Sequence, residues 1–98
     1  MSAGPDEVIH QSTRLRIVSS LNALGPREMM DFGQLKAVLE ITDGNLATHL
    51  AALEKAGYVQ ISKDFVGKKP RTRVALTAQG RRALRDHVTY LRSVLEGI

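Results

Sequence analysis

The stretch LAALEKAGYV, residues 50–59, contains the end of a helix, the glycine that terminates it and the start of a strand. Its two leucines lie three residues apart and continue a spacing that begins at Leu46, as on the buried side of a helix. Gly57 stands where a left-handed residue commonly closes a helix. After it, apolar and polar residues alternate as in a half-buried strand. The stretch therefore predicts a helix, with Thr42 or Asp43 as its N-cap, that passes directly into a β-strand.

Two further helices are predicted upstream. Apolar residues between positions 8 and 24 recur at helical spacing, Ser12 or Thr13 is the expected N-cap, and Gly25-Pro26 ends the helix because proline cannot continue it. Asp31 is a favourable N-cap for a short second helix. The apolar residues of that helix are expected to point into the core: Phe32, Leu35, Val38 and Leu39. The pattern leaves a short extra strand open near residues 28–30.

A basic run lies between two strand-like segments, residues 58–62 and 72–76. It spans residues 63–73 and holds five basic side chains against the single acid Asp64, a difference equal to the net charge of +4 of the whole chain. Its basic residues are Lys63, Lys68, Lys69, Arg71 and Arg73. A protruding cationic hairpin on an otherwise balanced domain predicts a phosphate backbone as its partner. The alternative is a solvated loop that only keeps the protein soluble.

Thr77 is the expected N-cap of a last helix, residues 77–96, which has an apolar side at spacings of four, three and four residues. This seam consists of Leu84, Val88, Leu91 and Leu95. It predicts self-association into a homodimer, because a chain of 98 residues leaves little core for Leu91 and Leu95 to cover. The alternative is that the seam covers the core of its own domain. We expect this of the part of the seam around Leu84.

The resulting order is helix, helix, helix, hairpin, helix in a single domain of residues 1–98, mainly α with a small β-hairpin. Residues 1–5 are expected to be disordered. The absence of cysteine excludes disulfides and thiolate metal sites. The apolar stretches are too short to span a membrane and the start of the chain has no signal-peptide character, so a cytoplasmic location is expected.

Catalysis is not indicated, and neither a cofactor nor a metal is expected. His10, His49 and His87 fall on three different predicted helices, and the sequence contains no HExxH motif, no glycine-rich phosphate loop and no nucleophile elbow. The minor alternative is a metal site across a dimer, in which His10 and His87 would meet carboxylates such as Asp6 or Asp86.

Four motifs in order resemble winged helix-turn-helix regulators of the MarR and ArsR types. They are residues 50–59, quoted above, Asp43-Gly44-Asn45-Leu46, Lys69-Pro70-Arg71-Thr72 and Leu76-Thr77-Ala78-Gln79-Gly80. The resemblance covers about residues 6–92 and is nearest to small regulators of a single domain. It implies that residues 42–56 form a recognition helix, residues 58–76 a wing and residues 77–96 a dimerisation helix, with the first helix contributing to the dimer.

The third helix is expected to read DNA with the side that faces away from its leucines. Asn45 suits a paired hydrogen bond to adenine, Thr48 suits a bond to a base or contact with a thymine methyl, and Gly44 permits close backbone approach. His49 is either a base reader or a half-buried packing residue. The predicted DNA-binding residues are Gly44, Asn45, Thr48, His49, Lys55, Lys68, Lys69, Arg71 and Arg73.

These features predict a sequence-specific transcriptional regulator that binds double-stranded DNA as a homodimer and represses by occupying an operator. Its two recognition helices would address half-sites about 34–36 Å apart. The alternative is a winged-helix protein-interaction module that holds an acidic partner with its hairpin and its last helix. The sequence identifies no residue that would bind a small-molecule effector. Compared with longer MarR-type regulators, it lacks the additional helical segments that could enclose an effector pocket.

Overall fold

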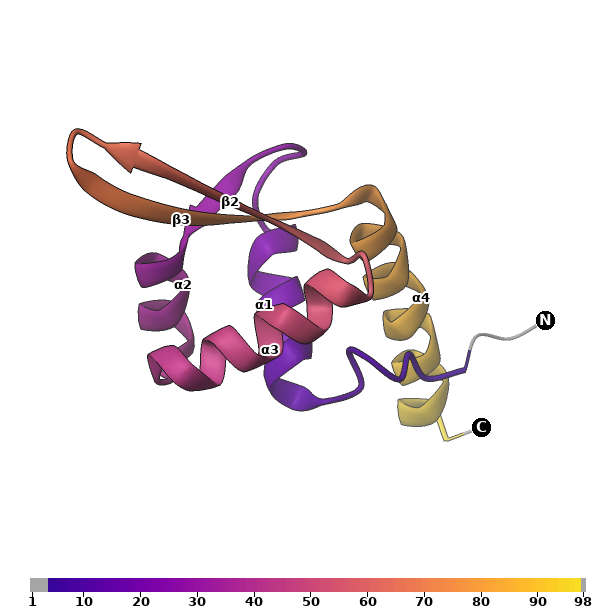
Figure 1. Ribbon diagram of the computed structural model, residues 1–98. Helices are drawn as coiled ribbons and strands as arrows, with labels where there is room; N and C mark the ends of the chain where they lie inside the picture. The colour runs from indigo at the N-terminus through magenta and orange to yellow at the C-terminus, as the bar shows by residue number, and fades with distance from the viewer. Residues whose placement is uncertain (1–3, 98) are drawn as a thin grey trace.

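Four helices and three strands make up the structure, a computed structural model that describes residues 4–97 (Figure 1). In chain order the elements are α1 (Ser12–Asn22), β1 (Met29–Asp31), α2 (Phe32–Leu39), α3 (Asp43–Lys55), β2 (Val59–Val66), β3 (Lys69–Leu76) and α4 (Ala78–Leu95). Of the N-terminal residues expected to be disordered, residues 1–3 lie outside the described range. The predicted α-α-α-β-β-α order is confirmed, and β1 forms where the sequence left a short strand open.

The three strands form one antiparallel sheet in the order β1-β3-β2. Ile61 of β2 pairs with Val74 of β3 in the part of the sheet that covers the helices. Both long strands have eight residues and continue past β1 as a ribbon that projects from the body (Figure 1). Gly67, with φ of 63°, and Lys68 form a two-residue loop between them, which suits a turn that needs a positive φ at its first loop residue. The strands are therefore longer than predicted and take up most of the basic run.

Side chains cap the helices that flank the predicted hairpin and turn. Asp31 and Gln34 form a reciprocal capping box at the start of α2, Thr42 accepts a hydrogen bond from the Asn45 amide at the start of α3, and the Thr77 hydroxyl caps α4. These predicted caps are confirmed, with Thr42 rather than Asp43 as the cap of α3. At the other end of α3, the glycine after the last turn has the expected left-handed φ, 82°.

The predicted N-cap of α1 is wrong. Gln11 is the cap, since its side-chain oxygen accepts a hydrogen bond from the Arg14 amide at 2.8 Å, and the helix begins at Ser12. The residues before it, 7–10, form a separate turn. The Asp6 carboxylate caps this turn, because it accepts hydrogen bonds from the amides of Val8 and Ile9, which would otherwise have no partner in a first helical turn.

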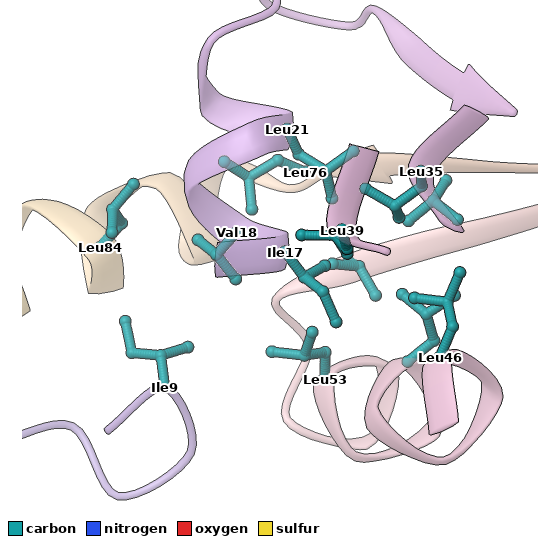
Figure 2. Close-up of a cluster of buried hydrophobic side chains, with 13 residues drawn as sticks. Ile9, Ile17, Val18, Leu21, Leu35, Leu39, Leu46, Leu53, Leu76 and Leu84 are labelled. Atoms are coloured by element: carbon teal, nitrogen blue, oxygen red, sulfur yellow. The ribbon is translucent and has the colours of Figure 1, made fainter. Parts of the chain in front are cut away.

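The core surrounds α1, which runs through the middle of the molecule (Figures 1 and 2). Figure 2 shows Ile17 facing Leu39, Leu46 and Leu53 from α2 and α3, and the three leucines predicted for the buried side of α3 are all buried. The prediction for Val38 is wrong, because 59% of this residue is exposed. The buried side of α2 is centred between Leu35 and Leu39, and Val38 lies about 80° from that centre.

Gly80 is the point where α4 meets the start of β2. A Cβ atom built on Gly80 would overlap the backbone carbonyl of Tyr58 and press on Leu76. Alanine is usually favoured over glycine inside a helix by about 1 kcal/mol, but this site has no room for a methyl group. We expect Gly80→Ala to lower the free energy of unfolding by about 1–3 kcal/mol in urea denaturation. Gly44→Ala is the control, because a Cβ there meets nothing within 4 Å, and an equal loss in both variants would contradict the explanation.

None of the helices in residues 4–97 combines the length and the apolar character needed to cross a lipid bilayer.

Candidate nucleic-acid interface

The N-terminal half of α3 exposes small and polar side chains. Gly44, Asn45 and Thr48 are all exposed, while the leucines of the same helix are buried beneath them. The Thr48 hydroxyl donates to the Gly44 carbonyl at 2.9 Å, so its proton is taken and its oxygen and methyl group remain outward. Thr48 can therefore accept a hydrogen bond or touch an apolar group. Lys55, at the last turn of α3, is also exposed.

Asp43 lies beside these residues in the first turn of α3. Its carboxylate pairs with the Lys36 ammonium of α2 at 2.8 Å, although 73% of the Asp43 side chain is exposed. A carboxylate at a helix N-terminus is favoured by the helix dipole, and the lysine offsets part of the repulsion that it would exert on a phosphate. The acid therefore stabilises the start of α3 in two ways.

His49 lies between α3 and α1. Its Nδ1 accepts a hydrogen bond from the Arg14 Nε at 3.3 Å, and the residue is half-buried. Burial first, and the charge of Arg14 second, hold the pKa of His49 below its usual value. The neutral ring already accepts a hydrogen bond within its own domain, so it is poorly suited to contact a base edge. The geometry therefore favours the packing alternative for His49.

Two arginines of the hairpin are held by one carboxylate. Asp64 accepts two hydrogen bonds from Arg71, at 2.9 and 2.7 Å, and one from Arg73 at 3.1 Å. The bond from Arg71 is the main cause that lowers the pKa of Asp64. The three residues form a cross-strand cluster, since Asp64 and Arg71 are paired in register. Arg71 and Arg73 therefore lie on one face of β3.

The lysines of the hairpin differ from the arginines. Lys63, Lys68 and Lys69 are exposed, and within residues 4–97 none of them has a carboxylate within ion-pair distance. The tip formed by Lys68 and Lys69 lies at the same end of the molecule as the start of α3, while α4 lies at the opposite end (Figure 1). The free positive charge of the hairpin is therefore concentrated at its tip, at the end of the molecule where α3 begins.

The two faces of the hairpin ribbon have different neighbours. Because strand residues alternate, Ile61, Lys63 and Phe65 share one face and Asp64 with its arginines the other. Lys63 and Ile61 line a groove together with Ala47 and Ala51 of α3. Arg71 and Arg73 thus lie on the face that points away from α3, which the sequence did not indicate.

The predicted seam on α4 divides into a buried and an exposed part. Leu84 is buried in the core of its own domain, as expected for this part of the seam, and Val88 and Leu91 are half-buried. Farther along, Leu95 is 84% exposed, and its neighbour Val94 is 54% exposed. The apolar surface that remains free on α4 is therefore in its last turn, preceded by the half-buried Leu91.

A buried polar network that the sequence did not indicate ties the N-terminal segment to α4. The Asp6 amide donates to Nδ1 of the buried His87 at 3.1 Å, and the Asp6 carboxylate accepts the Tyr58 hydroxyl at 2.6 Å. Burial is the main cause that raises the pKa of Tyr58 to about 12 and lowers that of His87. The His10 ring lies 5.5 Å from the His87 ring, centroid to centroid, but residues 4–97 contain no group of three metal-ligand side chains.

Stability is expected to fall between pH 7 and pH 5. The folded-state pKa values of His49 and His87 are lowered, so below about pH 6.5 the unfolded chain binds more protons than the folded one. The free energy of unfolding then decreases as the pH falls. For His87, the charge of His10 adds to this effect and that of Asp6 opposes it.

Urea unfolding at pH 7, 6 and 5 measures this dependence. His87→Asn keeps an acceptor for the Asp6 amide without a titrating group and is expected to flatten it, whereas substitution of the exposed His10 by Asn should change it less. A His87→Asn variant with the full pH dependence would rule out His87 as its source.

Known proteins share this arrangement. Residues 13–95 match the model of a family described as winged helix DNA-binding domain. An uncharacterised protein of Methanocaldococcus jannaschii is 32% identical over 82 residues, which is 84% of this chain and 86% of that protein. A transcriptional regulator homologue from Pyrococcus horikoshii OT3 has a TM-score of 0.83 at 30% identity and covers 94% of this chain and 88% of its own. A proposed MarR-family regulator from Enterococcus faecalis V583 has a TM-score of 0.71 at 27% identity, over 92% and 77% of the two chains.

Proposed function

This chain belongs to the family of winged helix DNA-binding domains and is a DNA-binding transcriptional regulator with double-stranded DNA as its partner, and on that premise we propose that it recognises one operator sequence as a homodimer and represses transcription. Membership of a family of DNA-binding regulators also separates it from enzymes. One observation carries the proposal: the exposed start of α3 and the lysine tip of the hairpin are at the same end of the molecule, the end away from α4 (Figure 1).

The recognition step falls to the first turns of α3. The helix enters a major groove about 12 Å wide with its small residues leading. Asn45 forms paired hydrogen bonds to adenine, and Thr48 presents its methyl group and oxygen to a neighbouring base. Gly44 lets the backbone approach closely because it has no side chain. Lys55 lies near the far end of the helix, where it meets a phosphate.

The hairpin positions the protein on the phosphate backbone. Lys68 and Lys69 carry this role, since both are exposed and free of carboxylates. Arg71 and Arg73 contribute less, because Asp64 neutralises part of their charge and holds them on the face away from α3. Contacts of this kind add affinity and register but little sequence preference.

The homodimer forms through the last two turns of α4, with Leu91, Val94 and Leu95 against the same residues of the second copy. Apolar side chains as exposed as Leu95 are what such a contact would bury. The two α3 helices then address half-sites about 34–36 Å apart on one side of the duplex. Repression needs no further surface, because a dimer that occupies the operator blocks other proteins from that DNA.

Selection from a random pool of duplexes by the purified chain tests the proposal. We expect one enriched sequence with two related halves, and an affinity that falls steeply with salt. Enrichment of no sequence, with binding that is weak even at low salt, would contradict specific recognition. That result, together with capture of an acidic protein by the hairpin, would favour the protein-interaction alternative.

A further inference from the structure

Two apolar side chains stand exposed at the tip of the hairpin. Phe65 is 70% exposed and Val66 is 56% exposed. The exposed apolar residues at the end of α4 would be buried in the proposed dimer, whereas Phe65 remains 70% exposed although Pro70 lies opposite it on β3. A large aromatic side chain left in water forgoes the stabilisation that burial would provide, so a partner that covers Phe65 would gain binding free energy from it.

Phe65 faces the same side of the ribbon as α3. It lies two and four residues beyond Lys63 and Ile61, which line the groove against α3, and strand residues two apart share a face. Its partner in register is Pro70 on β3. Val66 points to the opposite face, with Asp64. The hairpin therefore presents Phe65 toward the DNA that α3 is proposed to read, and Val66 away from it.

The surroundings of Phe65 are cationic and narrow. Lys63 lies on the same face and Lys68 lies in the loop, whereas Lys69, paired with Val66, lies on the opposite face of the tip. The loop has only two residues because Gly67 adopts a positive φ, so the tip is no wider than two strands. An apolar side chain at a narrow tip that carries lysines on both faces matches a groove whose walls are phosphates and whose floor is base edges.

We propose that Phe65 enters the minor groove beside the α3 contact as an apolar wedge that partly unstacks one base step and bends the duplex. The proposal rests on the proposed function, since it needs the protein on DNA. Proteins that insert Phe, Leu or Pro between base steps bend DNA toward the major groove, and pyrimidine–purine steps deform most easily. A TA or CA/TG step is therefore favoured under each hairpin tip, a preference exerted without a hydrogen bond to a base.

The test uses the full chain and the duplex that it selects from a random pool. Permanganate reactivity of thymines reports unstacking, and energy transfer between dyes at the duplex ends reports bending. With the wild type we expect one reactive step in each half-site and a shortened end-to-end distance. Phe65→Ala should lose both signals and bind about tenfold more weakly, with an unchanged dependence on salt because no charge is removed.

Two further variants separate the wedge from general damage. Phe65→Leu keeps an apolar side chain and should retain part of the bend, whereas Val66→Ala removes apolar surface from the opposite face and should retain all of it. A wild type that binds its duplex without unstacking, or a Phe65→Ala variant that bends it equally, overturns the wedge and leaves the proposed function standing. A wild type that binds no duplex overturns the proposed function, and the wedge with it.

Discussion

Replacement of both Lys68 and Lys69 by alanine is expected to weaken binding to the selected duplex by about two to three orders of magnitude at 0.1 M salt. The proposed dimer loses four positive charges in this variant. If each contacts one phosphate, the slope of log K against log salt becomes flatter by about three to four units. Titrations at several salt concentrations measure both quantities. The fold should be unaffected, since both side chains are exposed.

Two variants control for charge alone. Arg27→Ala with Arg82→Ala removes the same charge from a cleft beside the start of α4, away from the hairpin tip, and should leave the slope nearly unchanged. Asp64→Asn works in the opposite direction, because it releases Arg71 and Arg73 and should steepen the slope. If the Lys68/Lys69 variant and the Arg27/Arg82 variant lost equal amounts of DNA affinity, the net positive charge of the protein, and not the hairpin in particular, would account for binding.

The order of the elements could be predicted from the sequence because its signals are local. Asp31, Thr42 and Thr77 cap helices through their own backbone neighbours, and Gly57 supplies a backbone conformation that other residues avoid. None of these depends on the rest of the fold. The cap of α1 was missed because Asp6, which is held by His87 and Tyr58 from distant parts of the chain, caps a separate turn and leaves Gln11, an unusual cap, to start the helix.

Only part of the candidate site could be predicted from the sequence, because the other features depend on which residues the fold places opposite one another. Alternation places Phe65 on a face, but only the length of the ribbon shows that residues 4–97 leave it 70% exposed. The sequence placed Arg71 and Arg73 among the DNA-binding residues together with Lys68 and Lys69, whereas the strand register brings Asp64 against both arginines and neutralises part of their charge. The asymmetry between lysines and arginines thus arises from pairing between strands, which composition does not record.

Leu95→Glu is expected to raise the dissociation constant of the proposed dimer by at least about a hundredfold, because the contact would bury a charge without a partner. Leu95 is a better site than the half-buried Leu91, where a charge could act by unfolding the helix. Sedimentation equilibrium measures the change. Ser93→Glu adds the same charge to the same exposed helix end, about 160° around α4 from Leu95, and should leave the dimer intact.

Loss of the dimer should also weaken DNA binding, because the two half-sites are bound by one linked pair of subunits. A dimer engages its second half-site at a high effective concentration, so a monomeric variant should bind the full duplex about 10²- to 10⁴-fold more weakly and a single half-site as well as the wild type does. A Leu95→Glu chain that still sediments as a dimer would place the interface elsewhere on the molecule. A wild type that is monomeric while it binds its duplex would contradict the dimer itself, since one α3 helix and one hairpin would then read the whole site.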